Sequence, residues 1–486
     1  MTYIAGKPRE RRGLRISALH LLFMACTTMY AASPEVAVGQ LSADSLPDSY
    51  CLRKLPPATE QPIHFDETSR IWWHHFEDST LVALVHSAVE NNYNVQAAIR
   101  RIDASKASLA GTRASYYPSI SLNAGYDYNR DSGRIVQPYA DADTKASWTL
   151  GASLSWEIDI FGRIHEKLKG SRAQLRASRL EYEGVMLSLA AEVANDYSRY
   201  RMYQNQLRVA RNHLNSQARM LDLVETRFKE GLVSKLDVAQ ARNTLNLTKA
   251  LIPDLEANIS TTFNALVTLC NMPVDEITEL LASETFPLLT VPMDLGSPAE
   301  LLSRRPDIAG EAQQIQILAS KLGIAKKDYL PTLSISALVQ TMSHNLQEVF
   351  GAHSLHWSVV PTLSWTLFDG FSRSANVAEA KAEMEAEIDN YNMTVTTAVQ
   401  EVNNSIVDYN AAMRRMKLYE TVVTDSEEVL HLATERYKLG LTDFSEVATA
   451  QISLLNSETN YESTLSACFQ SIVTIYKAIG GGWIKQ

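Results

Sequence analysis

One phrase occurs twice in the sequence, as "RFKEGLVSKLDVAQAR" at Arg227–Arg242 and as "RYKLGLTDFSEVATAQ" at Arg436–Gln451. Each copy has the composition of a helix end, a glycine and the start of a second helix. Glycine often follows the last helical residue because it accepts a positive φ. Ser234 and Asp443 can then cap the returning helices. The two phrases therefore predict the tips of two long helical hairpins.

Two further phrases recur in the same order along the chain. The stretch "YYPSISLNA" at Tyr116 resembles "YLPTLSISA" at Tyr329, and "LSWEIDIFG" at Leu154 resembles "LSWTLFDG" at Leu363. A single similar phrase could arise by chance, but three collinear phrases indicate an internal repeat. We interpret the chain as two copies of one unit, at residues 79–270 and 306–480.

Long helices are predicted for residues 163–230 and 372–439, which contain no proline. Their apolar residues recur every three or four positions, which is typical of a coiled-coil seam. These residues are Leu207, Ala210, Leu214, Ala218, Leu221, Val224 and Phe228 in the first helix, and Val395, Val399, Val402, Ile406, Tyr409, Met413 and Met416 in the second. Shorter helices are predicted at 79–116, 234–270, 307–330 and 443–479, so that two short helices in line pack against each long one.

Strands are predicted where apolar residues alternate with polar or small ones, at 120–129, 148–160, 333–339 and 357–367. A half-buried strand of a soluble sheet has the same pattern, but strands of about ten residues with tryptophans near their ends also fit an outer-membrane barrel. Four strands cannot close a barrel in lipid, so a symmetric oligomer is expected. A trimer would provide twelve strands. The polar face expected to line its lumen carries Ser121, Asn123, Asp127, Asn129, Glu157 and Asp159.

Composition narrows the possible functions. The chain has 486 residues and a net charge of −10, which argues against a nucleic-acid-binding protein with a basic face. Its four cysteines lack CxxC spacing, so no zinc site is predicted, and Cys270 and Cys468 are expected to be buried thiols. The GxSxG, HExxH, P-loop and GxGxxG motifs are absent. We therefore predict no enzyme, no cofactor and no metal site.

The N-terminus predicts export from the cytoplasm. Basic residues precede an apolar stretch, Ile16–Ala25, that has the length of a signal peptide. Cys26 follows it directly, as in a bacterial lipoprotein signal, and would then carry lipid. A plain signal peptide cleaved near Ala31 or Ala32 is the alternative. No downstream run of 18 apolar residues occurs, so a membrane crossing would require a closed β-barrel.

The chain resembles the TolC/NodT-type outer-membrane efflux factors, especially the lipoprotein branch that works with RND-type pumps. The resemblance rests on the segments "IWWHHFEDSTLVALVHSAVENNYNVQAAIRRIDAS" at Ile71, "ASYYPSIS" at Ala114, "SWEIDIFGR" at Ser155, "LLSRRPDI" at Leu301, "DYLPTLSI" at Asp328, "LSWTLFDGFSR" at Leu363, both tip phrases and "IYKAIGGGW" at Ile475. It covers nearly the whole mature chain.

The resemblance implies an α+β membrane protein, namely a homotrimer with a twelve-stranded barrel that continues into a periplasmic helical tunnel. It also implies a segmentation into a signal peptide at 1–26, an extended segment at 27–78, the two repeats, an equatorial connector at 271–305 and a tail at 481–486. The implied function is the outer-membrane exit duct of a tripartite efflux pump. A duct for type I protein secretion and a non-transporting coiled-coil surface protein are the alternatives.

The resemblance further implies that the hairpin tips bind a periplasmic adaptor, which links the duct to an inner-membrane pump, and that the same end closes the pore. The implied adaptor contacts are Arg227, Gly231, Leu232, Ser234, Gly440, Leu441 and Thr442, and the implied gate residues are Arg436 and Asp443. In relatives, an acidic residue often lies two positions after the second tip glycine. Here Thr442 has that position and the acid is Asp443, so the gate chemistry is expected to be either shifted by one residue or weaker.

Overall fold

The computed structural model describes residues 72–130, 144–282 and 304–481, which belong to one structural unit. The predicted signal peptide, Cys26 and Cys51 lie outside the described residues. Among the described helices, none combines the length and the apolar character that a membrane-spanning helix needs.

The described elements follow the predicted order of helix, two strands, long helix and returning helix, twice. In the first half they are the 3₁₀ turn η4 (Trp72–Phe76), α2 (Ser79–Asn91), α3 (Tyr93–Ala114), β1 (Ser119–Arg130), β2 (Thr144–Ile158), α4 (Arg163–Lys229), α5 (Lys235–Cys270) and α6 (Val274–Leu280). In the second half they are α8 (Pro306–Lys327), β3 (Thr332–Ser343), η5 (Leu346–Glu348), η6 (Ala352–Ser354), β4 (Leu355–Ser364), α9 (Ser372–Lys438) and α10 (Phe444–Ala478).

Both long helices are confirmed, and each contains 67 residues. The prediction of one helix over 79–116 is wrong, because the chain is extended at Asn92 between α2 and α3. The Asn92 side chain accepts a hydrogen bond from the backbone N–H of Asn94 and donates one to the carbonyl oxygen of Leu269. Asparagine competes with helical hydrogen bonding in this way, so it ends α2 and caps α3.

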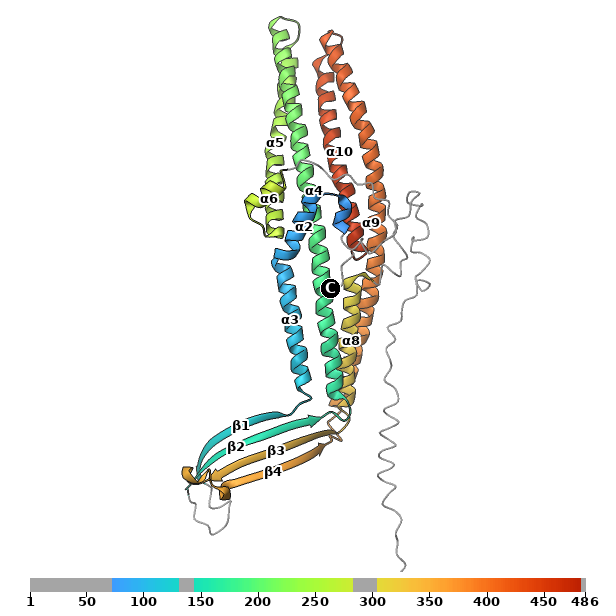
Figure 1. Ribbon diagram of the computed structural model, residues 1–486. Coiled ribbons are helices and arrows are strands. Elements are labelled where there is room, and N and C mark those ends of the chain that lie inside the picture. Colours follow the sequence, from blue (N-terminus) through green and yellow to red (C-terminus); the bar gives the residue numbers. More distant parts are fainter. Residues whose placement is uncertain (1–71, 131–143, 283–303, 482–486) are drawn as a thin grey trace, which may run out of the picture. The chain divides into compact units, whose positions relative to one another are not determined.

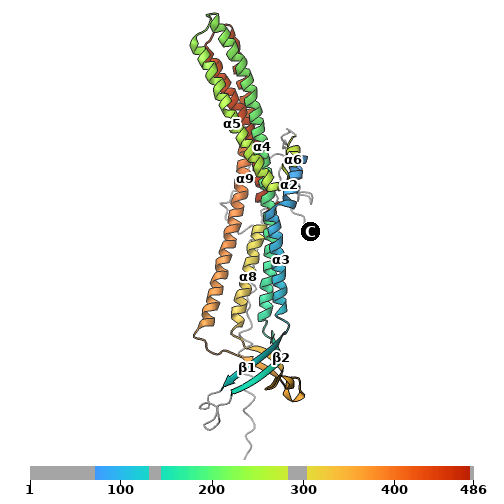
Figure 2. The ribbon, with the colours of Figure 1, turned by 90° about the vertical axis from the view of Figure 1, so that its left-hand side faces the viewer.

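The packing of the helices follows the predicted division into long and short partners (Figures 1 and 2). Helices α3 and α5 pack against successive parts of α4, while α8 and α10 pack against successive parts of α9. Contacts of α8 with α4, of α10 with α4 and of α10 with α5 join the halves. Each long helix therefore belongs to one hairpin, α4–α5 or α9–α10, and α4 contacts both.

The predicted seam is buried at four of its seven positions in α9, is half-buried at Tyr409, Met413 and Met416, and is partly wrong in α4. Val395, Val399, Val402 and Ile406 are buried. In α4, Ala218 and Phe228 are exposed, and polar His213 and Gln217 are buried instead. The reason is that α4 packs against α10 as well as α5, so a second stripe of its surface is covered.

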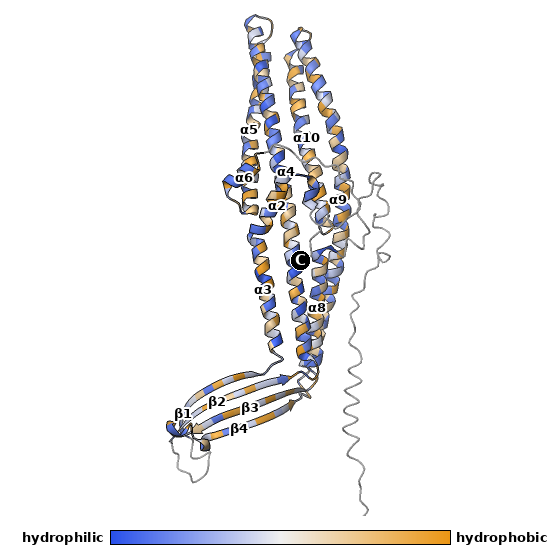
Figure 3. Cartoon of the chain, viewed as in Figure 1, coloured by the Kyte–Doolittle hydropathy of each residue, from blue (hydrophilic) through white to orange (hydrophobic). Residues whose placement is uncertain are grey.

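The four strands form one antiparallel sheet in the order β1-β2-β3-β4, and its register separates two faces. On one face, apolar residues lie opposite one another across the sheet. This row includes the pairs Leu154–Ala337, Ala152–Val339, Ala337–Val359 and Val339–Trp357. The other face pairs small and polar residues, including Ser121–Ser153, Ser155–Ser336 and Ser334–Thr362. Because side chains alternate along a strand, this register gives one apolar and one largely polar face. The hydropathy of successive strand residues varies along the ribbon in Figure 3.

The apolar face of the sheet is exposed within the described chain. Ile120, Leu122, Trp357 and Leu363 are all more than half exposed, and β1 and β4 are edge strands. The prediction that Asp159 belongs to the polar strand face is wrong, because β2 ends at Ile158. The Asp159 carboxylate instead accepts hydrogen bonds from the backbone N–H groups of Ile164 and His165 and so caps the start of α4.

Candidate functional site

The two hairpin turns share one hydrogen-bonding pattern, which the repeated phrases predict. Gly231 and Gly440 have φ values of +77° and +73°. The Leu232 N–H donates a hydrogen bond to the Arg227 carbonyl, and the Leu441 N–H donates one to the Arg436 carbonyl. The nitrogen–oxygen distance is 2.9 Å in both. These bonds define a Schellman motif, in which a residue of positive φ satisfies the last carbonyl groups of a helix. Both turns therefore depend on glycine, as expected.

The caps of the two returning helices differ. Ser234 forms a capping box with Asp237, in which each side chain bonds the backbone N–H of the other residue. Asp443 has the N-cap position of α10, but its side chain makes no capping hydrogen bond. The prediction of a cap is thus confirmed for Ser234 and only positionally correct for Asp443. The carboxylate of Asp443 is exposed and free to meet another group.

A small core, which we call the tip core, joins the two hairpins below these turns. It consists of Val224, Val238, Ala241, Ala433, Tyr437, Phe444, Val447, Ala448 and Ala450. The Tyr437 and Phe444 rings meet edge to face with their centroids 5.5 Å apart. Burial raises the pKa of the Tyr437 hydroxyl, with a further contribution from the charge of Asp237. Residues from both hairpins contribute to this core, so it holds the tips together within one chain.

Arg227 links the first hairpin to the second. Its guanidinium donates a hydrogen bond of 2.9 Å to the main-chain carbonyl of Tyr437 and lies 5.2 Å from the centre of the Tyr437 ring. That carbonyl is in the last turn of α9, where the helix dipole favours a positive charge. The contact thus combines a charge-assisted hydrogen bond, a cation–π contact and a helix-end interaction.

Arg436 corresponds to Arg227 in the second phrase, but its contact is different. It lies 3.7 Å from the Glu446 carboxylate of its own hairpin, and both side chains are at least half exposed. The chain therefore pairs Arg436 with Glu446 rather than Asp443. The predicted ion pairs of Arg436 and Asp443 across a pore involve neighbouring chains and stay a prediction.

Both turns present leucines at their outermost positions. Leu232 and Leu441 are 63% and 66% exposed, and Thr442 is half-buried beside the second leucine. A Cβ added at Gly231 or Gly440 would meet no heavy atom within 4 Å. The apices are therefore open at their glycines, and each presents an exposed leucine. They could contact the side of a helix from a partner protein.

On the side of the tip core that is away from the turns, α4 and α10 contact each other through polar side chains. Ser198 and Ser466 share a buried hydrogen bond of 2.7 Å. Gln206 donates to the Ser463 hydroxyl and the Thr459 carbonyl. Further along, a ring nitrogen of His213 contacts the Glu458 carboxylate. The hairpins of one chain are therefore held together by directional polar contacts along this seam.

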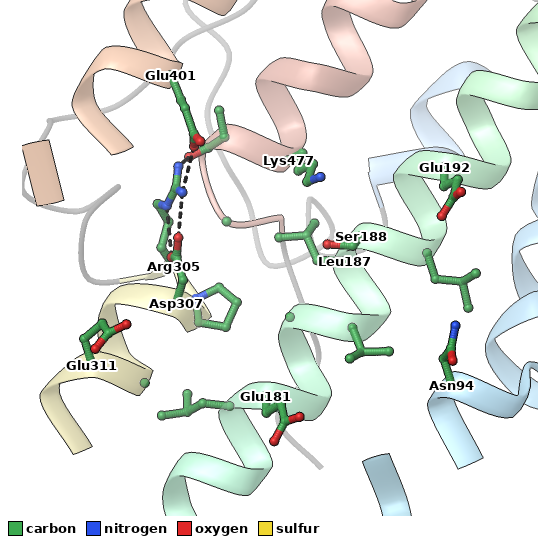
Figure 4. Close-up of a pocket in the computed structure, with 18 of the residues that line it drawn as sticks. Asn94, Glu181, Leu187, Ser188, Glu192, Arg305, Asp307, Glu311, Glu401 and Lys477 are labelled. Carbon is green, nitrogen blue, oxygen red and sulfur yellow. Dashed lines mark hydrogen bonds and ion pairs between the residues drawn. The ribbon is translucent and has the colours of Figure 1, made fainter. Parts of the chain in front are cut away.

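Sequence reasoning missed a second polar centre, which borders a cavity of about 1110 Å³ between α4 and the α8–α9–α10 side (Figure 4). Arg305, just before α8, donates to the Asp307 carboxylate at 2.7 Å and the Ala478 carbonyl at 2.8 Å, and pairs with Glu401 at 2.8 Å. Its side chain is buried. The "RRPDI" motif could have indicated this role, because an arginine and an aspartate flank a proline at a helix start.

Asp307 makes this centre sensitive to acid. Burial alone would raise its pKa, but hydrogen bonds and charge from Arg305 outweigh that effect and hold the pKa below its usual range. Because its pKa is lower in the folded state, Asp307 stabilises the fold at any pH above its unfolded-state pKa of about 3.9. This stabilisation is lost as the pH falls through the folded-state pKa.

We expect Asp307→Asn to lower the unfolding temperature at pH 7 and to reduce the further loss seen below about pH 4. Calorimetry across this pH range measures both effects. Glu385→Gln is the matched control, because Glu385 pairs with Lys381 on an open helix surface and should change little. Equal pH profiles for Asp307→Asn and the wild type would contradict the assignment.

The described side chains include no group of three or more His, Cys, Asp or Glu residues arranged to hold a metal ion. Cys270 and Cys468 are buried and free, as predicted. Burial raises the pKa of the Cys270 thiol to about 12, which disfavours the reactive thiolate.

Two helical hairpins with similar tips, joined to a four-stranded sheet with one apolar face, form the fold that this chain shares with TolC-like outer-membrane channels. The sequence profile of the family "Outer membrane efflux protein" matches residues 84–272 and 297–481. The chain belongs to this family, whose members are transport ducts rather than enzymes. The predicted family is thereby confirmed.

Individual relatives support the same assignment. The chain is 26% identical to Nodulation protein T of Rhizobium leguminosarum bv. trifolii, with 88% of this chain and 93% of the relative covered. It is also 26% identical to the toluene efflux pump outer membrane protein TtgI of Pseudomonas putida, with 84% and 86% covered.

Among solved structures, the outer-membrane channel OprN superimposes with a TM-score of 0.80 at 29% identity, over 85% of this chain and 93% of that one. The Campylobacter jejuni CmeC outer membrane channel superimposes with a TM-score of 0.82 at 22% identity, over 88% and 90%. The second match supports the fold alone.

Proposed function

We propose that this protein is the outer-membrane exit duct of a tripartite efflux pump, which passively conducts small molecules to the cell exterior. The observation that carries the proposal is the sheet, whose register puts apolar side chains on one face and largely polar ones on the other. A sheet with an exposed apolar face suits lipid on that side and a water-filled lumen on the other.

The duct is a homotrimer in this proposal. Edge strands β1 and β4 present main-chain groups that lipid cannot satisfy, and pairing β4 with β1 of the next chain closes a twelve-stranded barrel. Pro361 lies in β4 opposite Ile335 and has no main-chain N–H to donate to a neighbouring strand. The polar residues Ser121, Asn123, Asp127, Asn129 and Glu157 would face the lumen.

The chain is built from two repeats in this proposal, at 79–270 and 306–480, joined by an equatorial connector at 271–305. The same order of elements in both halves and the two segments matched by one family profile support the repeat. Cys26 is proposed as the site of lipidation after removal of residues 1–25. Mass spectrometry of the mature N-terminus tests this, and an unlipidated N-terminus at Ser33 would contradict it.

The hairpin tips are the proposed adaptor dock and pore gate. Gly231, Leu232, Gly440 and Leu441 form the open apices, beside Arg227, Ser234 and Thr442, while Arg436 and Asp443 flank the second apex. The names of the efflux-pump relatives favour small apolar molecules over a secreted protein as cargo, and an inner-membrane RND-type pump would select them.

The proposal is tested by measuring the mass and the conductance of the purified protein. Native mass spectrometry in detergent should show three chains, and planar bilayers containing this trimer should show discrete single channels. A folded monomer, or a trimer without channels, would instead favour a coiled-coil surface protein that does not transport.

A further inference from the structure

The two tips have matching sequences but unequal surroundings. Helices α4 and α9 have equal length, and their alignment without a gap sets Phe228 opposite Tyr437. Tyr437 is 3% exposed and carries Arg227 over its ring, whereas Phe228 is 43% exposed. In the described part of the chain, no cation is found over the Phe228 ring. The contact of Arg227 with Tyr437 is therefore present within the described chain, whereas the equivalent contact of Arg436 with Phe228 is not.

The flanks of the long helices show the same inequality. Ser198 and His213 of α4 are buried against α10, through Ser466 and Glu458. Their counterparts in α9 under the same alignment are Val407 and Val422, which are 56% and 41% exposed. At these two positions, the face of α9 that corresponds to the α10-binding face of α4 lacks a partner and carries exposed valines.

We propose that, in the trimer, Arg436 binds the main-chain carbonyl and the ring of Phe228 in the neighbouring chain. This contact, which we call the inter-chain clasp, repeats across the subunit boundary what Arg227 does to Tyr437 within each chain. It rests on the proposed trimer. We assume that one rotation about the trimer axis superimposes hairpin α4–α5 on hairpin α9–α10. The same rotation then superimposes hairpin α9–α10 on hairpin α4–α5 of the next chain. This hairpin of the next chain would lie beside the exposed face of α9.

The geometry of the single chain permits this change of partner. The present ion pair of Arg436 with Glu446 is long and at least half exposed on both sides, and such pairs stabilise a protein weakly. Phe228 lies in the last turn of α4, so its carbonyl has the same favourable helix-end position as that of Tyr437. Arg436 would therefore exchange its weak ion pair with Glu446 for a carbonyl and ring contact of the kind that Arg227 makes with Tyr437.

Cysteine cross-linking tests the clasp. Phe228→Cys and Arg436→Cys are combined in a chain whose Cys51, Cys270 and Cys468 are replaced by alanine, and the trimer is treated with a short bismaleimide. Denaturing electrophoresis should then show covalently linked chains. The matched control combines Arg227→Cys with Tyr437→Cys, which should link only within one chain because their contact is internal. Each single-cysteine variant should give no linked chains.

The outcomes separate this inference from the proposed function. A preparation that is not trimeric by native mass contradicts the proposed assembly. A trimer in which the Phe228–Arg436 pair gives no linked chains, while a cysteine at Asp443 captures Arg436→Cys between chains, contradicts the clasp alone. In that case Arg436 would face Asp443 across the pore, as the sequence suggested.

Discussion

Replacing Gly440 with tryptophan is expected to weaken binding of the adaptor protein strongly while the trimer still assembles. Gly440 has a φ of +73° and open space around its Cα, so the local cost is that of a left-handed non-glycine residue, about 1–2 kcal/mol. The larger effect is steric, because an indole on the apex would separate Leu441 from the side of a partner helix.

Adaptor binding to the purified trimer is measured by surface plasmon resonance, with native mass spectrometry of the same sample to confirm assembly. We expect at least about a hundredfold weaker binding, equivalent to about 2.7 kcal/mol. Gly231→Trp should act in the same way at the first apex, because both turns have the same Schellman geometry.

Two controls separate shape from backbone strain. Gly440→Asn keeps a residue that tolerates positive φ and should retain most of the binding. Gly111→Trp adds the same ring to an exposed position of α3, where nothing lies within 4 Å of the added Cβ, and should leave adaptor binding unchanged. Wild-type affinity in Gly440→Trp would show that the adaptor binds elsewhere on the hairpins.

Local rules predicted most of the fold. The positions of both tips follow from the conformational freedom of glycine at Gly231 and Gly440, and the sheet follows from alternation with a period of two. The error at Asn92 has a tertiary cause, because its side chain bonds Leu269 of α5, and no local pattern indicates that partner. Asp159 was misplaced for a similar reason, since a capping carboxylate and a strand-face carboxylate have the same sequence appearance.

The positions of the two turns were predicted, but the contacts around them were not. The repeated phrases identified Arg227 and Arg436 as equivalents, whereas the structure gives them different partners, Tyr437 and Glu446. Equivalence in sequence could not reveal this, because Arg227 lies beside the end of α9 in the other hairpin, whereas Arg436 contacts Glu446 of its own hairpin. The Arg305 centre was missed because Glu401 and Ala478 are distant in sequence.

Arg227→Gln is expected to raise the conductance of the closed channel by loosening the two hairpins of each chain at their tips. The substitution removes the hydrogen bond from a charged group to the Tyr437 carbonyl and the contact with its ring. Hydrogen bonds to charged groups contribute about 1.5–3 kcal/mol. Loss of one such bond per chain should therefore increase the open population at least about tenfold.

Single-channel recording in planar bilayers measures this increase, and thermal unfolding checks that the fold is kept. Arg242→Gln is the matched control, because Arg242 pairs with Glu225 inside the first hairpin and spans no boundary between hairpins. It removes the same charge and should not change the conductance. Arg227→Lys keeps the charge but loses the planar stacking group, so an intermediate conductance is expected. If Arg242→Gln opened the channel as strongly as Arg227→Gln, net charge at the tip would control closure, and the contact with Tyr437 would have only a structural role.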